Sequence, residues 1–397
     1  MSNDTQPEIR FPGFTDDWEE RKLGEVVVFL NGRAFKQQEL LDSGKYRVLR
    51  VGNFNTNDRW YYSNLELEED KYANKGDLLY LWATSFGPEI WNEERVIYHY
   101  HIWKLKFLSK ELDKQYLYTW LLTDKEKIKE STNGTTMVHV TKGGIEQRTF
   151  QFPPDINEQQ KIGAFFKQLD DTIALHQRKL DLLKETKKGF LQKMFPKNGA
   201  KVPEIRFPGF TEDWEQRKFK EFSKKTGKKN TKDLDFPAYS VSNKAGLISQ
   251  TEQFDGSRLD DLEKTNYKFV EPNEFAYNPA RVNVGSIAFN NLGMTVIVSS
   301  LYVVVKMSED LDNEFILQFI KSPTFIKEVK RNTEGSVREY LFYENFANIK
   351  FPFTRNKEEQ QKIGAFFKQL DDTIALHQRK LDLLKETKKG FLQKMFV

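Results

Sequence analysis

Few residues in this chain have the types and spacing that catalysis requires. Pro154 and Asp155, followed by Glu185 and Lys187, match the Pro-Asp…Glu-x-Lys pattern of metal-dependent nucleases. The Glu-x-Lys part recurs at residues 386–388, where no Pro-Asp accompanies it. A short motif counts only in its structural context. We therefore interpret this match as a coincidence inside a repeated segment.

A second motif, Tyr-Asn-Pro-Ala-Arg at residues 277–281, contains the Asn-Pro of amino-methyltransferases. The aromatic residue that completes that motif is absent, and no glycine-rich cofactor loop accompanies it. The sequence also lacks a phosphate-binding Gly-x4-Gly-Lys-Ser/Thr motif. Hence we predict that the chain is not an enzyme and binds no cofactor itself.

The histidines do not have the spacing of a metal site. His99 and His101 alternate along a predicted strand, which favours packing or surface roles over zinc binding. His176 and His377 fall at helical seam positions, where a paired core histidine can set register. With no cysteine in the chain, neither a disulfide nor a thiolate site can form. No metal site is predicted.

The composition indicates a soluble protein of several domains. Across 397 residues no apolar run reaches the length that a membrane span needs. The first ten residues lack the layout of a signal peptide, and the absence of cysteine suits a reducing cytoplasm. With 62 Lys and Arg against 58 Asp and Glu, the overall charge does not by itself indicate nucleic acid. We expect a cytoplasmic location.

The dominant feature is an internal repeat. Residues 158–195 recur letter for letter at 359–396, and residues 7–25 match 203–221 at 15 of 19 positions. Fainter matches align residues 131–136 with 332–337 and residues 76–80 with 273–277. Each half therefore reads as an entry tag, a globular α/β unit and an identical long segment. The globular units share a plan but differ in their residues.

The identical segments predict long helices with a coiled-coil seam. Apolar residues alternate four and three apart, and each helix would span roughly 57 Å at 1.5 Å per residue. Because few residues separate the first helix from the second tag, we predict an antiparallel pair in which each entry tag caps the helix of the other half. The predicted seam comprises Ile162, Phe166, Leu169, Ile173, His176, Leu180 and Leu183, with Ile363, Phe367, Leu370, Ile374, His377, Leu381 and Leu384.

Two identical surfaces with two different heads suit a protein that binds two copies of one partner and reads two separate targets. DNA half-sites at a fixed spacing fit this description. The chain resembles the specificity subunits of bacterial Type I restriction-modification enzymes. The resemblance covers nearly the whole chain and is carried by the tags PEIRFPGF, the segments FQFPPDINEQQKIGAFF and IKFPFTRNKEEQQKIGAFF, and residues 76–80 and 239–250.

The resemblance implies an α+β fold with two α/β target-recognition domains, separated by two long helices that form an antiparallel coiled coil with a pseudo-twofold repeat. The implied boundaries are 1–25 for the tag, 20–152 for the first recognition domain, 153–202 for the central helical region, 203–352 for the second domain with its tag, and 353–397 for the second helix. One departure is expected: the approach from Phe351 to Glu359 is two residues longer than that from Phe152 to Glu158.

The resemblance also implies the partners. They are double-stranded DNA with a bipartite target, two adenine methyltransferase subunits that use S-adenosylmethionine, and restriction subunits that use ATP and Mg. Side chains that contact base edges and phosphates are expected in loops at corresponding places of the two halves. They are Asn53, Asn55, Asn57, Arg59, Thr84, Ser85, Thr135, Thr136 and His139 in the first half, and Ser242, Asn243, Lys244, Arg281, Asn283, Ser336, Arg338 and Tyr340 in the second.

Blander interpretations remain open at this point. The polar loops suit plain solvated surface as well as DNA contact. Recent duplication alone accounts for identical helices, and the seams would also serve a generic scaffold or a homodimer. The main alternative is a coiled-coil adaptor whose heads bind proteins and which does not recognise DNA.

Overall fold

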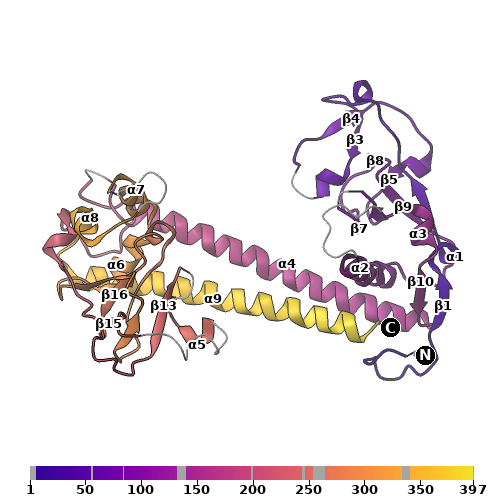
Figure 1. Ribbon diagram of the computed structural model, residues 1–397. Coiled ribbons are helices and arrows are strands. Elements are labelled where there is room, and N and C mark those ends of the chain that lie inside the picture. The colour runs from indigo at the N-terminus through magenta and orange to yellow at the C-terminus, as the bar shows by residue number, and fades with distance from the viewer. Residues whose placement is uncertain are drawn as a thin grey trace. The chain divides into compact units, whose positions relative to one another are not determined.

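The computed structural model describes residues 6–54, 57–83, 85–131, 140–197, 200–243, 246–253, 264–332 and 340–396 (Figure 1). The chain divides into two units. Unit 1 comprises Met1–Gln177 with Lys380–Val397, and unit 2 comprises Arg178–Arg379. Both boundaries fall inside the long helices, so each unit contains one part of each identical segment.

Unit 1 contains two four-stranded sheets and one two-stranded ladder. The sheet order β2-β9-β6-β7 is antiparallel throughout, whereas the order β4-β3-β8-β5 includes a parallel pair, β3 with β8. Side chains of both sheets, among them Leu49, Leu79 and Tyr98, form a shared apolar core. The strands are β1 (Glu19–Lys22), β2 (Val27–Asn31), β3 (Tyr46–Leu49), β4 (Tyr61–Ser63), β5 (Tyr72–Ala73), β6 (Leu78–Leu81), β7 (Gly87–Ile90), β8 (Val96–Tyr98), β9 (Ile102–Phe107) and β10 (Thr149–Phe152).

Unit 2 repeats this topology, and each strand of unit 1 has a counterpart numbered ten higher. The sheets follow the orders β12-β19-β16-β17 and β14-β13-β18-β15, and β11 pairs with β20 as β1 pairs with β10. Tyr80 pairs with Trp103 and Tyr277 pairs with Val303, as the predicted match of residues 76–80 with 273–277 requires. The strands are β11 (Glu215–Lys218), β12 (Ser223–Lys225), β13 (Ala238–Ser242), β14 (Gly246–Ser249), β15 (Lys268–Val270), β16 (Glu274–Tyr277), β17 (Ile287–Phe289), β18 (Val296–Val298), β19 (Val303–Met307) and β20 (Lys350–Phe353).

The short helices differ more between the units than the strands do. Where unit 1 has one helix of 18 residues, unit 2 has two helices that break at Pro323, whose ring and missing N–H prevent a continuous helix. The helices are α1 (Leu23–Val26), α2 (Lys114–Ser131) and α3 (Lys142–Glu146) in unit 1, and α5 (Gln250–Gln253), α6 (Asn313–Ile320), α7 (Pro323–Asn332) and α8 (Tyr343–Asn348) in unit 2.

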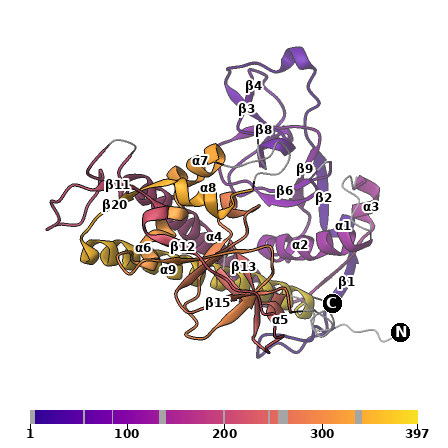
Figure 2. The same cartoon turned by 60° about the vertical axis from the view of Figure 1, so that its left-hand side comes forward.

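The two long helices, α4 (Ile156–Lys193) and α9 (Lys357–Lys394), run side by side in each unit (Figures 1 and 2). In unit 1 the rings of Phe165 and Phe391 lie 5.0 Å apart, and Lys388 donates to Asp170 at 2.5 Å. In unit 2 the rings of Phe190 and Phe366 lie 5.1 Å apart, and Lys187 donates to Asp371 at 2.6 Å. Partner numbers fall as α4 numbers rise, so the pairing is antiparallel, as predicted.

The predicted seam residues differ in burial along the helices. Six are buried, namely Ile162, Phe166, Leu180, Ile363, Phe367 and Leu381, and the other eight, including His176 and His377, are half-buried. Two of the buried positions in each copy lie at the start of the helix, where it packs on a globular core. Further along the helix pair Leu180 and Leu381 are also buried, whereas the other seam side chains are only partly shielded.

Each entry tag is tied to a long helix by a buried ion pair. Arg10 donates to both carboxylate oxygens of Glu158 at 2.6 and 2.8 Å, and Arg206 contacts Glu359 at 2.6 and 2.9 Å. Both glutamates are fully buried. The adjacent buried glutamines repeat one network, because Gln159 and Gln360 each donate to two carbonyl oxygens. These ion pairs and hydrogen bonds show that the repeated Glu-Gln-Gln holds the start of each long helix to the neighbouring segments.

The tags also cap the long helices as predicted. The backbone N–H of Ile9 donates to the carbonyl oxygen of Lys394 at 3.0 Å, and Ile205 donates to Lys193 at 3.0 Å. A helix leaves its last carbonyl groups without partners of its own, and the tag supplies one. In unit 1 this joins the first tag to the helix of the second half.

The expected two-residue difference in the approaches to the helices is wrong. Arg21 pairs with Phe150, and Arg217 pairs with Phe351, so Phe351 corresponds to Phe150 rather than to Phe152. Glu158 follows Phe152 by six residues, and Glu359 follows the equivalent Phe353 by the same number. Phenylalanines alternate in both strands, so the letters alone permit two alignments, and the strand register selects one.

Candidate nucleic-acid interface

The first predicted loop of unit 1 is folded by its own asparagines. Asn53 accepts from the backbone N–H of Arg50 at 3.0 Å and donates to the carbonyl oxygens of Asn57 and Arg59 at 3.1 and 3.2 Å. Asn57 accepts from the N–H of Arg59 at 3.0 Å. Such local bonds compete with outward contacts. The two amides therefore shape the loop, while the Arg59 side chain is 65% exposed beside Asp42.

The second predicted loop connects β6 to β7. It lies beside Val140, which follows the third predicted group, Thr135, Thr136 and His139. The N–H of Trp82 donates to the carbonyl oxygen of His101 at 3.2 Å, and Val140 donates to the carbonyl oxygen of Trp82 at 3.3 Å. Ser85 lies in this loop and is exposed. The predicted residues Asn55, Thr84, Thr135, Thr136 and His139 lie outside the described residues, but the chain on both sides of Thr84 and just after His139 belongs to this region.

A turn between β8 and β9 joins these loops, and sequence reasoning gave it no role in DNA binding. The N–H of His99 donates to the carbonyl oxygen of Leu49 at 2.8 Å, next to Arg50 at the start of the first loop. The Trp82 indole donates to the carbonyl oxygen of Tyr100 at 2.8 Å. The structure thus adds Arg50, Trp82 and residues 99–101 to the predicted site. The prediction that His99 and His101 alternate along one strand is wrong, because β8 ends at Tyr98 and β9 begins at Ile102. The available signal was the His-Tyr-His run itself.

The charges at this end of unit 1 suit a polyanion and its bases. The guanidinium groups of Arg50 and Arg59 lie 4.3 and 5.0 Å from the centroid of the Tyr61 ring. Burial, together with the charges of His101 and Arg50, lowers the pKa of His99 to about 4. His99 is therefore neutral at pH 7 and able both to donate and to accept a hydrogen bond.

Unit 2 also brings its predicted loops together. Ser242 ends β13 and Asn243 follows, while Arg281 and Asn283 lie at the 3₁₀ turn Val282–Val284. The hydroxyl of Ser286 donates to the carbonyl oxygen of Val241 at 3.0 Å, which links these two segments. Leu341, next to Tyr340, donates to the carbonyl oxygen of Pro279 at 3.0 Å. Lys244, Ser336 and Arg338 lie outside the described residues.

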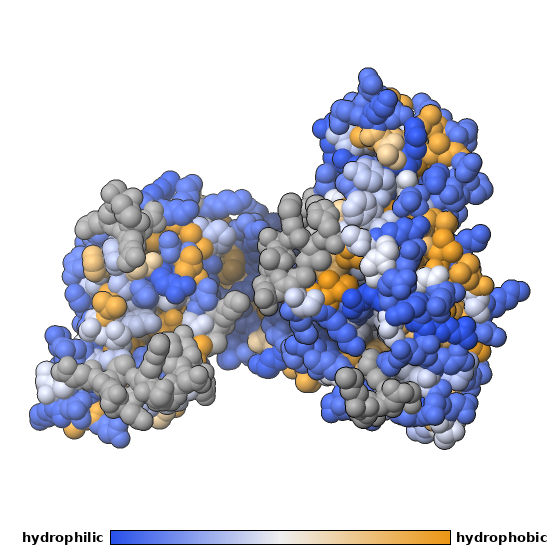
Figure 3. Space-filling view, turned by 45° about the vertical axis from the view of Figure 1, so that its right-hand side comes forward, coloured by the Kyte–Doolittle hydropathy of each residue, from blue (hydrophilic) through white to orange (hydrophobic). Residues whose placement is uncertain are grey.

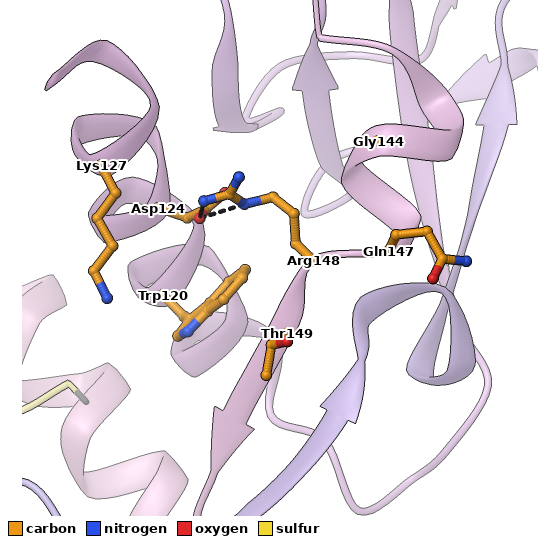
Figure 4. Close-up of a pocket in the computed structure, with 7 residues that line it drawn as sticks. All are labelled: Trp120, Asp124, Lys127, Gly144, Gln147, Arg148 and Thr149. Carbon is orange, nitrogen blue, oxygen red and sulfur yellow. Dashed lines mark hydrogen bonds and ion pairs between the residues drawn. The ribbon is translucent and has the colours of Figure 1, made fainter. Parts of the chain in front are cut away.

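A polar pocket of about 460 Å³ lies between α2 and the segment from α3 to β10 in unit 1 (Figure 4). The Asp124 carboxylate, 4% exposed, accepts from Arg148 Nε at 2.5 Å. Burial raises the pKa of Asp124, and the Arg148 charge opposes this shift. The ion pair fastens α2 to the residue that precedes β10. The lining comprises Trp120, Asp124, Lys127, Gly144, Gln147, Arg148 and Thr149.

Other kinds of site have no support in the described part of the chain. No group of three His, Asp or Glu side chains is arranged there to hold a metal ion. Among the helices described, none combines the length and apolar character that crossing a membrane requires. The visible faces are largely hydrophilic with small hydrophobic patches (Figure 3). The two loop regions therefore remain the strongest candidates for function.

Comparisons with known proteins agree on one family. The family model described as "Type I restriction modification DNA specificity domain" matches residues 15–185 and 211–386. The Type I restriction enzyme MjaVIII specificity subunit of Methanocaldococcus jannaschii is 24% identical over 398 residues, which cover 95% of this chain and 91% of that protein.

Solved structures show the same fold at low sequence identity. The Type-I restriction-modification system S subunit from M. genitalium matches with a TM-score of 0.66 and 15% identity over 99% of both chains. A chain from a structural study of complex assembly in the type I R-M system matches with a TM-score of 0.50 and 14% identity, covering 96% of this chain and 97% of that one. Together with the doubled family match, these findings show that the chain belongs to the specificity subunits of Type I restriction-modification systems.

Proposed function

We propose that this specificity subunit is non-catalytic and that each unit reads one half of a bipartite site in double-stranded DNA. The paired helices set the spacing of the half-sites and dock two methyltransferase subunits, through which restriction subunits join the complex. One observation carries the proposal. The two units share a strand order but differ in their loop residues, whereas residues 158–195 and 359–396, which form nearly all of the long helices, are identical.

The loop chemistry supports DNA reading. Arg59 lies in the β3–β4 loop of unit 1, and the corresponding β13–β14 loop of unit 2 presents Asn243. The β6–β7 loop of unit 1 contains Trp82 and Ser85, whereas the corresponding β16–β17 loop of unit 2 contains Arg281 and Asn283. The two arginines suit phosphates or guanine edges. Different donors and acceptors at equivalent places would give the two half-sites different sequences.

The helices support docking of two copies of one partner. In unit 1, Leu175 lies five residues after Asp170 and Leu383 five residues before Lys388, so the two leucines lie at the same level of the helix pair. They are 57% and 67% exposed. In unit 2, Leu376 and Leu182 repeat this arrangement around Asp371 and Lys187 with the same exposures. Each unit thus offers an equivalent pair of exposed leucines.

The direct test is a genome-wide map of N6-methyladenine with the gene present and deleted. We expect deletion to remove one gapped, bipartite motif, which would also identify both half-sites. If the methylation pattern does not change in a host that expresses the methyltransferase subunits, the chain is not acting as their specificity subunit. Retention of the complex on DNA, with salt-sensitive binding, would exclude a protein-binding adaptor.

The spacing role has its own test. Insertion of seven residues after Gln177 and seven after Gln378 preserves the seam and lengthens both helices by about 10 Å. The gap in the methylated motif should grow by about three base pairs, at 3.4 Å per base pair, with both half-sites unchanged. Insertions of three residues, which shift the seam, serve as the control and should disrupt pairing. An unaltered gap after the seven-residue insertions would contradict the proposal that the helix pair sets the spacing of the half-sites.

A further inference from the structure

We infer that the turn between β8 and β9, formed by His99, Tyr100 and His101, contacts base edges in the half-site read by unit 1 and helps to determine its sequence. The inference rests on the proposed function and names a reading element that the predicted loop residues do not include. It stands on three observations, which are a rigid backbone, a cluster of partly exposed rings and a divergent counterpart in unit 2.

The backbone of the turn is held on both sides. Arg33 donates to the carbonyl oxygen of Tyr98 at 2.9 Å and accepts from the N–H of Tyr100 at 3.0 Å. Ile102 donates to the carbonyl oxygen of His99 at 2.9 Å. At Gly32 a Cβ atom would lie 2.4 Å from the His99 carbonyl oxygen, so this close approach requires glycine. A turn fixed in this way presents its side chains at little further cost in entropy.

The side chains form a compact cluster of rings at the surface. The ring centroids of Tyr100 and His101 are 3.9 Å apart, those of His99 and His101 are 4.9 Å apart, and the Trp82 indole lies 4.9 Å from His101. Tyr100 is 39% exposed, and both imidazoles are half-buried. Imidazole and phenol groups offer donors and acceptors that match those of base edges.

The position of the turn places it among the other reading groups. Its backbone reaches Leu49, beside the loop that presents Arg59, and Trp82, in the loop of Ser85. The arginines of this region are suited to phosphates, which fix orientation but carry little sequence information. The imidazole and phenol groups of the turn carry donors and acceptors and are therefore the better candidates for base contact.

Unit 2 builds the same turn from different residues. Tyr98 and Val298 occupy equivalent places in the parallel pairs β3–β8 and β13–β18, and Trp103 and Val303 pair with the equivalent tyrosines. Ser299, Ser300 and Leu301 therefore replace the three ring-bearing residues without a change of length. Leu301 is 75% exposed. The residues of this turn do not belong to the apolar core of either unit. Their sequence can therefore differ between the units, as two different half-sites would require.

This equivalence supplies a matched variant. His99→Ser, Tyr100→Ser and His101→Leu together place in unit 1 the turn that unit 2 already forms. The complex with methyltransferase subunits is assembled with the wild-type or variant chain. The methylated motif is then mapped, and affinity is measured for DNA carrying each base at each half-site position. Tyr100→Ser alone is a milder second variant, and Lys106→Ala, at the other end of β9, is the control.

We expect the variant to lose about tenfold or more of its preference at one or more positions of a single half-site, with the other half-site unchanged. Lys106→Ala should leave both half-sites unchanged. A uniform loss of affinity over all sequences, or an unaltered motif with unaltered affinities in both turn variants, would overturn the inference. The proposed function fails separately, if the wild-type complex itself methylates no gapped motif.

Discussion

The buried ion pairs at the two tags give a prediction at the scale of single residues. Replacing Arg10 with Met would leave the Glu158 carboxylate, which is 0% exposed, without its partner. Removing one member of a buried pair costs about 3–5 kcal/mol, because an uncompensated charge stays buried. We expect chemical denaturation to show a loss of this order in the free energy of unfolding of unit 1.

Arg21 provides a matched control, because its pair with Glu19 is exposed on both sides, at 43% and 41%. Arg21→Met should change stability by less than about 1 kcal/mol. Adding Glu158→Gln to Arg10→Met removes the stranded charge and should restore part of the loss. Equal losses for the Arg10 and Arg21 variants would contradict the special role of the buried pair.

Asp124 gives a prediction about pH. Burial raises its pKa above the ordinary value of 3.8, so the folded chain holds this proton more tightly than the unfolded chain does. The contribution of Asp124 to stability is therefore full below pH 3.8 and is lost as the pH rises through the raised pKa. Relative to wild type, Asp124→Asn should gain stability over that window and then level off. If the stability of Asp124→Asn relative to wild type falls instead as the pH rises, the Arg148 charge outweighs burial in setting the pKa of Asp124.

At the scale of elements, the exposed leucines of the helix pair can be tested. Leu175→Ser with Leu383→Ser should weaken binding of one methyltransferase subunit, because apolar area that docking would bury is lost. Folding should change by less than about 0.5 kcal/mol, since both side chains are largely exposed. Native mass spectrometry of the assembled complex should show a loss of one methyltransferase copy.

Lys380→Ser, also on the exposed surface of α9 in unit 1, is the control and should keep both copies. Adding Leu182→Ser and Leu376→Ser in unit 2 should remove the second copy as well. Full stoichiometry in the four-leucine variant at concentrations near the dissociation constant would place the docking surface elsewhere.

The elements were more predictable from sequence than the site. The repeat and the four-three spacing predicted two long helices and equivalent strands such as β6 and β16, because local periodicity determines both. The register of β10 and β20 was not predictable, since alternating phenylalanines fit two alignments. Nor was the role of Asn53, whose bonds close its own loop, because such contacts depend on the folded backbone.

At the scale of the whole molecule, each unit is built from both halves of the sequence. The core of unit 1 includes Phe396, whose ring lies 6.5 Å from Trp18 and 5.5 Å from Tyr116. In unit 2 the end of the repeated segment, just after α4, supplies Phe195, which lies 6.3 Å from Trp214 and 5.5 Å from Phe315. Neither half can therefore complete its own core, but the identical segments make α4 a chemical substitute for α9.

This composite construction predicts that residues 1–197 alone form a homodimer. The α4 of one copy would pack antiparallel on that of the other, and Phe195 would take the place of Phe396 beside Trp18 and Tyr116. Light scattering after gel filtration should give twice the half-chain mass, and Phe195→Asp, which charges the shared core, should abolish the dimer. A folded half-chain that stays monomeric at micromolar concentration would mean that something other than the repeated residues, such as the link between α4 and the second tag, is needed to complete the unit.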